Sequence, residues 1–173
     1  PVRVDSHIRQ KLESAQNQHE EGQVFVWLGG AGGLGVNGTP VNADWTAQSD
    51  QLGSQMGWSV ATAGDVNGDG YDDVIIGWPY YLNLNGPVNG RACVWHGGAG
   101  GMGAAGTPAN ADWTVDGEAS RQVGLSVSTA GDANGDGYSD VLIGAPDTAE
   151  GDGIGGRAYL YRGSAAGLLG VAT

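Results

Sequence analysis

The sequence predicts an all-β chain built from repeated units of four short antiparallel strands. Glycine accounts for 34 of the 173 residues, only 15% of the residues are charged, and 40% are hydrophobic. This composition is typical of short strands joined by tight turns, and it argues against disorder, which needs low hydrophobicity and high charge. No stretch after residue 23 places its apolar residues at the spacing of a helix.

An internal repeat is the third observation behind this fold class. GTPVNADWTA (38–47) returns as GTPANADWTV (106–115), and GWSVATAGDVNGDGYDDVIIGWP (57–79) returns as GLSVSTAGDANGDGYSDVLIGAP (124–146). A third, partial copy begins at GRAYLYRGSAAGL (156–168), which matches GRACVWHGGAGGM (90–102). Four strands in each repeat are the signature of a propeller blade, so the sequence predicts β-propeller-type blades.

Within one unit, each strand is justified by its own pattern. Residues 58–63 alternate apolar and small polar side chains, and residues 73–78 form a compact apolar run. Residues 91–96 and 111–115 are two further strand-like runs, separated by Gly, Asn and Pro clusters. Closed propellers have about four to eight blades, whereas this chain holds only about two to two and a half, so we expect an incomplete propeller.

The repeats divide the chain into four parts. They are an N-terminal extension or degenerate strand and loop of a preceding blade (1–22), a partial blade of outer strands (23–56), a complete blade (57–115) and a partial blade (116–173).

Two loops carry oxygen-bearing side chains at identical offsets just before an apolar run. The predicted metal ligands are Asp65, Asn67, Asp69, the Tyr71 carbonyl and Asp73, and, in the second loop, Asp132, Asn134, Asp136, the Tyr138 carbonyl and Asp140. Calcium prefers six to eight hard oxygens, carboxylates and carbonyls together. A single loop of this kind would equally be a tight hairpin turn, but the exact repetition favours two calcium sites. A classical EF-hand is excluded because Ile76 and Ile143 stand where its last glutamate would be.

The two loops and the runs that follow them resemble the FG-GAP repeat of integrin alpha-subunit β-propellers and their bacterial relatives. The FG element is present as Gly57-Trp58 and Gly124-Leu125, and the GAP element as Gly77-Trp78-Pro79 and Gly144-Ala145-Pro146. The resemblance covers about residues 23–170. It implies calcium in the loop between the first and second strand of each blade, held by the residues named above.

The net charge of the chain limits the kinds of partner that it can bind. The formal net charge of −12, from 19 acidic and 7 basic residues, repels nucleic acid and anionic membranes and attracts cations. No apolar run approaches the length needed to cross a bilayer. We therefore expect no nucleic acid partner and no membrane insertion, and a secreted or cell-surface location where millimolar calcium fills such loops.

The leading hypothesis is a non-catalytic, calcium-binding module for extracellular adhesion, recognition or structural self-assembly. Open blade edges favour strand complementation with other copies or with remaining blades, in a ring or a filament. One alternative is a part of a secreted enzyme, which a pocket around Asp44, Asp112 or Glu118 would support. Another is a carbohydrate-binding module, in which the aromatic residues that do not recur form an exposed patch for a glycan or protein ligand: Trp58, Trp78, Tyr80 and Tyr81.

Overall fold

The computed structural model describes residues 2–5, 22–30, 38–82, 90–117, 122–146, 149–150 and 153–170. Its described elements are twelve strands and two single 3₁₀ turns. The strands are β1 (Val2–Asp5), β2 (Gln23–Leu28), β3 (Trp45–Gln48), β4 (Ser59–Gly64), β5 (Asp73–Trp78), β6 (Arg91–Trp95), β7 (Trp113–Asp116), β8 (Ser126–Gly131), β9 (Asp140–Ala145), β10 (Ala149–Glu150), β11 (Gly153–Ile154) and β12 (Arg157–Tyr161). The turns are η1 (Pro40–Asn42) and η2 (Pro108–Asn110).

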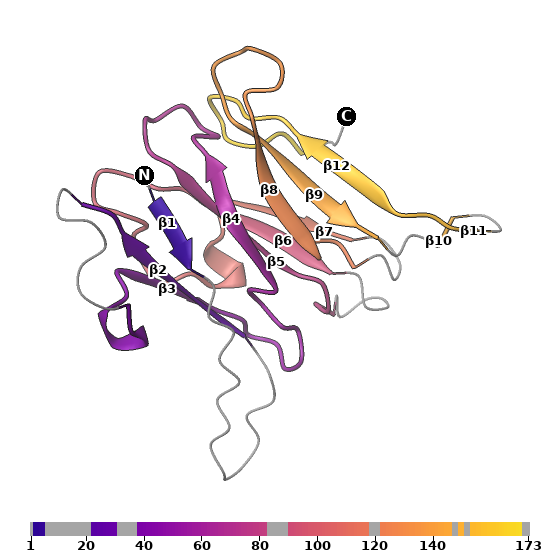
Figure 1. Cartoon of the computed structure of the whole chain (residues 1–173), viewed down its shortest axis with the longest axis horizontal. Coiled ribbons are helices and arrows are strands. Elements are labelled where there is room, and N and C mark those ends of the chain that lie inside the picture. Colours follow the sequence, from indigo (N-terminus) through magenta and orange to yellow (C-terminus); the bar gives the residue numbers. More distant parts are fainter. Residues whose placement is uncertain are drawn as a thin grey trace, which may run out of the picture.

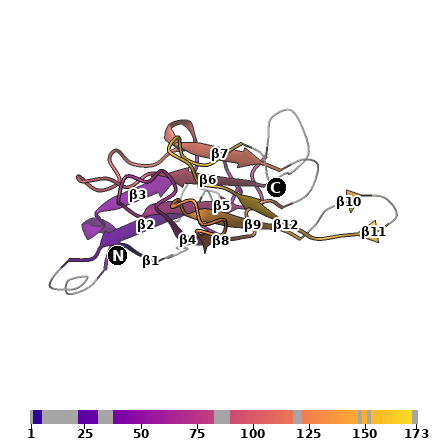
Figure 2. The ribbon, with the colours of Figure 1, turned by 90° about the horizontal axis from the view of Figure 1, so that it is seen from above.

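The strands form three successive antiparallel sheets and one short hairpin (Figure 1). The sheet orders are β1-β2-β3, β4-β5-β6-β7 and β12-β9-β8, and β10 pairs with β11. Seen from above, the three sheets lie side by side, with β1, β4 and β8 along one side of the molecule and β7 on the opposite side (Figure 2). This all-β arrangement of partial blades confirms the predicted fold class.

The first sheet includes a strand from the N-terminal region. β1 pairs antiparallel with β2, from Val2 opposite Leu28 to Asp5 opposite Phe25. In the second sheet, β5 pairs with β6 in the same way, so β1 occupies the place of a second strand. The rest of the segment that we expected to be an extension or a degenerate strand and loop, residues 6–21, lies outside the described part of the chain.

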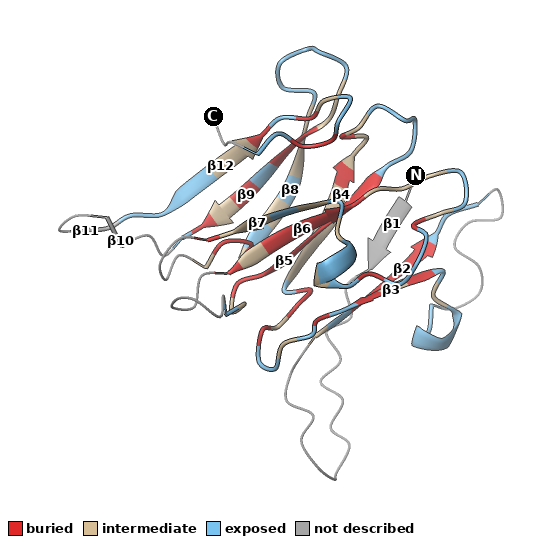
Figure 3. Ribbon diagram, turned by 180° about the vertical axis from the view of Figure 1, so that it is seen from behind, coloured by how far each residue is buried: buried red, intermediate tan, exposed pale blue. Residues whose placement is uncertain are grey.

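The central sheet is buried on both faces because a sheet packs on each side of it. Every residue of β5 is buried, and Figure 3 shows the central strands mostly in red. Side chains of β5 and β6 alternate between two apolar clusters, as the period of a strand requires. Val74, Ile76, Trp78, Cys93 and Trp95 join β2 and β3, whereas Ile75, Ala92 and Val94 join β9 and β12.

In each unit, the recurring tryptophan is hydrogen-bonded to the recurring GTP-x-NADW segment that follows it. The indole Nε1 of Trp27 donates to Asn42 Oδ1 at 3.0 Å, and that of Trp95 donates to Asn110 Oδ1 at 3.1 Å. The same asparagine oxygens accept the backbone N–H of Thr39 and Thr107 at 2.7 Å. These hydrogen bonds therefore tie each 3₁₀ turn to the strand that precedes it, which explains why these residues recur together.

The thiol of Cys93 is expected to be unreactive while the chain is folded. Its side chain is fully buried, with Sγ 3.2 Å from the Thr114 hydroxyl, and burial raises the pKa of the thiol to about 12. Because the thiolate is the reactive form, labelling by iodoacetamide at pH 8 should be slower than in the unfolded chain by about three orders of magnitude. Mass spectrometry of time points with and without guanidinium measures this; equal rates would contradict the burial.

Candidate metal centre

The two acid-rich loops lie at the same end of neighbouring sheets. Residues 65–72 join β4 to β5, and residues 132–139 join β8 to β9; both loops are at the top of Figure 1. Each preceding strand ends in a register shift, between Thr62 and Gly64 and between Thr129 and Gly131. The bulge bends the strand and re-aims its last residues, which directs the chain into the loop.

The first aspartate of each loop is the centre around which the backbone winds. Asp65 Oδ1 accepts the N–H groups of Gly68 at 2.7 Å and Asp69 at 3.0 Å, and its Oδ2 accepts that of Gly70 at 2.8 Å. Gly68 and Gly70 have φ of 77° and 89°, the left-handed region that glycine adopts without strain. The loop therefore needs glycine at both positions to turn its N–H groups inward.

The second loop repeats this network. Asp132 accepts the N–H groups of Gly135 at 2.7 Å, Asp136 at 3.0 Å and Gly137 at 2.8 Å. These hydrogen bonds, led by that from Gly137, lower the pKa of Asp132, although its burial acts in the opposite direction. The carboxylate is thus held in its charged form at the centre of the loop.

Asn67 and Asp69 lie next to each other in the first loop. Asn67 Nδ2 donates to Asp69 Oδ2 at 3.2 Å, and Asp69 Oδ1 accepts the Tyr71 N–H at 3.0 Å. Asn134 and Asp136 make the matching contact at 2.8 Å, and the Tyr138 N–H reaches Asp136 Oδ1 at 3.0 Å. The structure therefore brings the first three predicted side-chain ligands of each loop together, in two nearly identical copies.

The last aspartate of each loop lies beneath the loop and is completely buried. Asp73 Oδ2 accepts the Val66 N–H and its Oδ1 accepts the Gly97 N–H, both at 2.9 Å. Asp140 is held in the same way by Ala133 and Gly163, each at 3.0 Å. Asp73 and Asp140 therefore join the start of the loop to the turn after the third strand, a structural role that the sequence motif alone did not reveal.

Burial raises the pKa of Asp73 to about 6, against the lowering effect of its two backbone donors and of His96. Asp69 adds to the increase by charge repulsion. A cation near these carboxylates would favour their charged forms and relieve the repulsion.

The tyrosines have a role that sequence reasoning missed. Gly68 lies against the Tyr138 ring so closely that a Cβ there would be 2.5 Å from Cε1. The same loop accepts two backbone hydrogen bonds from the third sheet region: Ser139 N–H to the Asp65 carbonyl at 2.8 Å and Ser164 N–H to the Val66 carbonyl at 3.0 Å. The Tyr138 ring thus forms part of the contact between the second and third sheets. The recurrence of tyrosine at one position of the repeat was the signal in the sequence that could have revealed this role.

The predicted ligand atoms of the two loops are of the chemical kind that a hard divalent cation prefers. The predicted ligands in each loop are carboxylate, amide and backbone oxygens, and an oxygen that accepts one N–H retains a further lone pair. Within the described residues, no three His, Cys, Asp or Glu side chains are grouped closely enough to hold a metal ion.

The second and third sheets each carry an acidic loop between their first two strands. Antiparallel sheets of three and four strands with such loops define an array of β-propeller blades. The particular repeat is FG-GAP, whose family profile matches residues 56–94 and 123–161.

The chain is similar to integrin alpha subunits. It is 34% identical to integrin alpha-3 of Cricetulus griseus over 124 residues, 40% identical to integrin alpha-PS2 of Drosophila melanogaster over 129 residues, and 35% identical to integrin alpha-6 of Homo sapiens over 117 residues. These alignments cover 70%, 69% and 68% of this chain and 11%, 8% and 9% of the relatives. The chain therefore spans about a tenth of the length of the curated relatives that it matches.

The predicted aromatic patch is wrong in part. Trp78 is fully buried and packs against Trp95 and Tyr81, because β5 lies between two sheets. Trp58 is 46% exposed, and its ring meets that of Tyr80 edge to face at 5.8 Å. The surface feature is therefore a pair, Trp58 and Tyr80, at the opposite end of β4 and β5 from the acidic loop.

Proposed function

We propose that this chain is a calcium-binding, non-catalytic FG-GAP β-propeller module that acts outside the cell or at its surface. The observation that carries this proposal is the exact repetition of the loop network: two aspartates, Asp65 and Asp132, each accept three backbone N–H bonds in the same order. In the calcium-bound state the ligands would be Asp65, Asn67, Asp69, the Tyr71 carbonyl and Asp73, with Asp132, Asn134, Asp136, the Tyr138 carbonyl and Asp140 in the second site. The cation would cross-link each loop and so stiffen the contact between neighbouring sheets.

Calcium titration by calorimetry tests this proposal. Two sites per chain are expected, and Asp69→Asn should remove one of them while leaving the other. A chain that binds no calcium at millimolar concentration would contradict the proposal.

The role that we propose is adhesion, recognition or structural self-assembly, supported by the similarity to integrin alpha subunits. Extracellular calcium is millimolar, which suits loops of modest affinity, and no helix in the described part of the chain is long and apolar enough to cross a membrane. Partners would be other copies of the chain, further propeller blades, or an extracellular protein or glycan. Light scattering with calcium and with a chelator separates assembly from recognition, because only assembly changes the mass of the chain alone.

Two aspartates outside the loops, which were considered for an enzymatic site, have structural roles. This supports the proposal that the chain is non-catalytic. Asp44 Oδ2 accepts the Leu28 N–H and Asp112 Oδ2 accepts the His96 N–H, each at 2.7 Å. These carboxylates therefore hold the ends of β2 and β6 in equivalent positions, which accounts for their recurrence without an enzyme. Glu118, the third acid considered for an enzymatic site, lies outside the described residues.

Recognition of a glycan or protein is a second candidate, favoured by Trp58 and Tyr80. An exposed tryptophan beside a tyrosine offers apolar ring area with polar tips, as binding surfaces commonly do. If this pair binds a ligand, Trp58→Ala should abolish signals on a glycan array, whereas Leu52→Ala, at a residue 51% exposed, should not. Unchanged signals with Trp58→Ala would exclude the pair.

A further inference from the structure

The two acidic loops contain dipeptides whose backbone rearranges readily in water. Each loop holds Asn-Gly followed by Asp-Gly, at 67–70 in the first loop and at 134–137 in the second. In such a pair the glycine nitrogen attacks the side-chain carbonyl carbon of the residue before it, because glycine has no side chain to hinder the approach. The ring that forms, a succinimide, then opens with water to aspartate or isoaspartate.

In each loop, one carboxylate holds both of the glycine nitrogens that would attack. Gly68 donates its N–H to Asp65 Oδ1 at 2.7 Å, and Gly70 donates to Asp65 Oδ2 at 2.8 Å. Asp132 holds the two glycines of the second loop at the same two distances. Because the nitrogen must give up its hydrogen in order to attack, these charge-assisted hydrogen bonds oppose the reaction.

The asparagine side chain of each loop is also engaged. Asn67 Oδ1 accepts the Asp69 N–H at 3.0 Å, and its Nδ2 donates to Asp69 Oδ2 at 3.2 Å. Asn134 and Asp136 make the same two contacts, at 3.3 Å and 2.8 Å. Ring closure expels Nδ2 as ammonia, so it breaks the second of these contacts in each loop.

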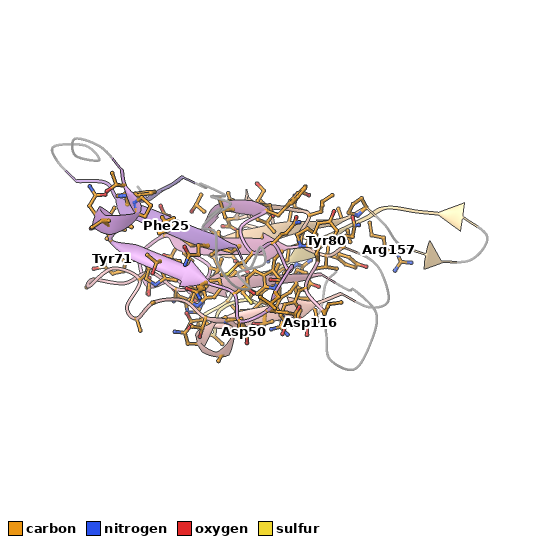
Figure 4. All side chains as sticks on the ribbon, turned by 90° about the horizontal axis from the view of Figure 1, so that it is seen from below. Phe25, Asp50, Tyr71, Tyr80, Asp116 and Arg157 are labelled. Atoms are coloured by element: carbon orange, nitrogen blue, oxygen red, sulfur yellow. The ribbon has the colours of Figure 1, made fainter. Side chains whose placement is uncertain are left out.

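Burial does not protect these dipeptides. Gly68 and Gly70 are exposed to solvent, although the third sheet packs beside their loop, so water can reach them. Figure 4 shows Tyr71, the next residue, toward the same end of the molecule as Phe25 and away from Arg157. The hydrogen bonds are therefore the feature of this loop that can slow the reaction.

We propose that Asn67 and Asn134 are latent deamidation sites, which the carboxylates of Asp65 and Asp132 keep unreactive. Once its hydrogen bond to Asp65 is lost, the Gly68 nitrogen forms a bond to Asn67 Cγ. The bond from Cγ to Nδ2 breaks, and the hydrogen of the Gly68 nitrogen leaves with Nδ2 as ammonia. Water, the only co-reactant, then adds to one carbonyl carbon of the ring and opens it. Isoaspartate formed in this way adds a methylene group to the backbone of the loop.

Peptide mapping by mass spectrometry of the full chain, aged in chelator at mildly alkaline pH, tests this inference. Each amide that becomes an acid changes the mass of its peptide. In the folded chain, Asn67 and Asn134 should convert about 10–100 times more slowly than in guanidinium, the factor that one hydrogen bond to a charged group supplies. Equal rates in the folded and the unfolded chain would overturn the inference.

Two variants separate the carboxylate from the general rigidity of the fold. Asp65→Ala removes both acceptor oxygens and should speed the conversion of Asn67 at least about tenfold, while Asn134 in the same molecule keeps its slow rate. Asp65→Asn retains one oxygen and should give an intermediate rate. Two results overturn the inference: an unchanged rate at Asn67, or an equal acceleration of both asparagines in both variants.

Asp72→Asn is the matched control. It removes one charge from an exposed residue of the same loop that takes part in none of the hydrogen bonds above, so both rates should stay unchanged. An acceleration equal to that of Asp65→Ala would assign the effect to charge alone and contradict the role of the hydrogen bonds. Because calcium is absent throughout, a failure here leaves the calcium sites untouched, and a chain that binds no calcium leaves this inference untouched.

Discussion

Removal of calcium should lower the thermal unfolding midpoint of this chain by about 10–20 °C. A site filled at about 100 times its Kd contributes about 2.7 kcal/mol to the free energy of unfolding. At this chain length 1 kcal/mol corresponds to about 2–4 °C, and two sites are proposed. Calorimetric scans in 2 mM calcium and in excess chelator measure the difference, which magnesium should reproduce only in part because it demands a tighter octahedral cage.

The double variant Asp69→Asn, Asp136→Asn should lose most of this calcium-dependent difference. Asparagine keeps an acceptor for the N–H groups of Tyr71 and Tyr138, so the midpoint in chelator should change little. Asp72→Asn is the matched control, because it removes one charge from the same loop at an exposed residue outside the predicted ligands. A midpoint that is the same with calcium and with chelator would refute the metal sites.

Gly77→Ala is expected to destabilise the chain by about 3 kcal/mol, the upper part of the range for overpacking a core. Gly77 lies in the buried strand β5, and a Cβ there would overlap the Gly124 carbonyl of the next blade. The Ser59 hydroxyl donates to that same carbonyl at 2.7 Å, so the peptide has little room to retreat. The thermal midpoint should fall by about 6–12 °C.

Gly144→Ala tests the same repeat position without the neighbouring blade. A Cβ at Gly144 would meet only the Ser126 hydroxyl closely, with the next atom at 3.6 Å. Ser126 is exposed and its hydroxyl is free to rotate away, so the stability should stay within about 1 kcal/mol of the unchanged chain. A loss equal to that of Gly77→Ala would show that the cost arises within the strand and not between blades.

Much of the fold followed from local pattern. The apolar run DVIIGW became β5 with the bounds that the sequence indicated, since a run buried on both faces needs no alternation. The strand that we expected at 111–115 lies at Trp113–Asp116. Asp112 precedes this strand, donates its N–H to the Val94 carbonyl at 2.9 Å and accepts the His96 N–H with its carboxylate.

The burial of individual side chains could not be read from the repeat. Ile75 and Leu142 occupy the same repeat position, yet Ile75 is fully buried and Leu142 is 40% exposed. The third sheet covers Ile75, whereas no described element packs on Leu142. A residue's position in the repeat determines which face it occupies, and only the presence of a neighbouring sheet determines whether that face is buried.

By itself, the sequence determined the class of fold, the unit of repetition and the two oxygen-rich loops, because strand period, turn residues and ligand spacing are all local. The tertiary structure decided where Asp73 and Asp140 direct their carboxylates, which tryptophan stays exposed, and how Tyr138 meets Gly68. These depend on contacts between residues of different blades, and such contacts exist only after the sheets have packed.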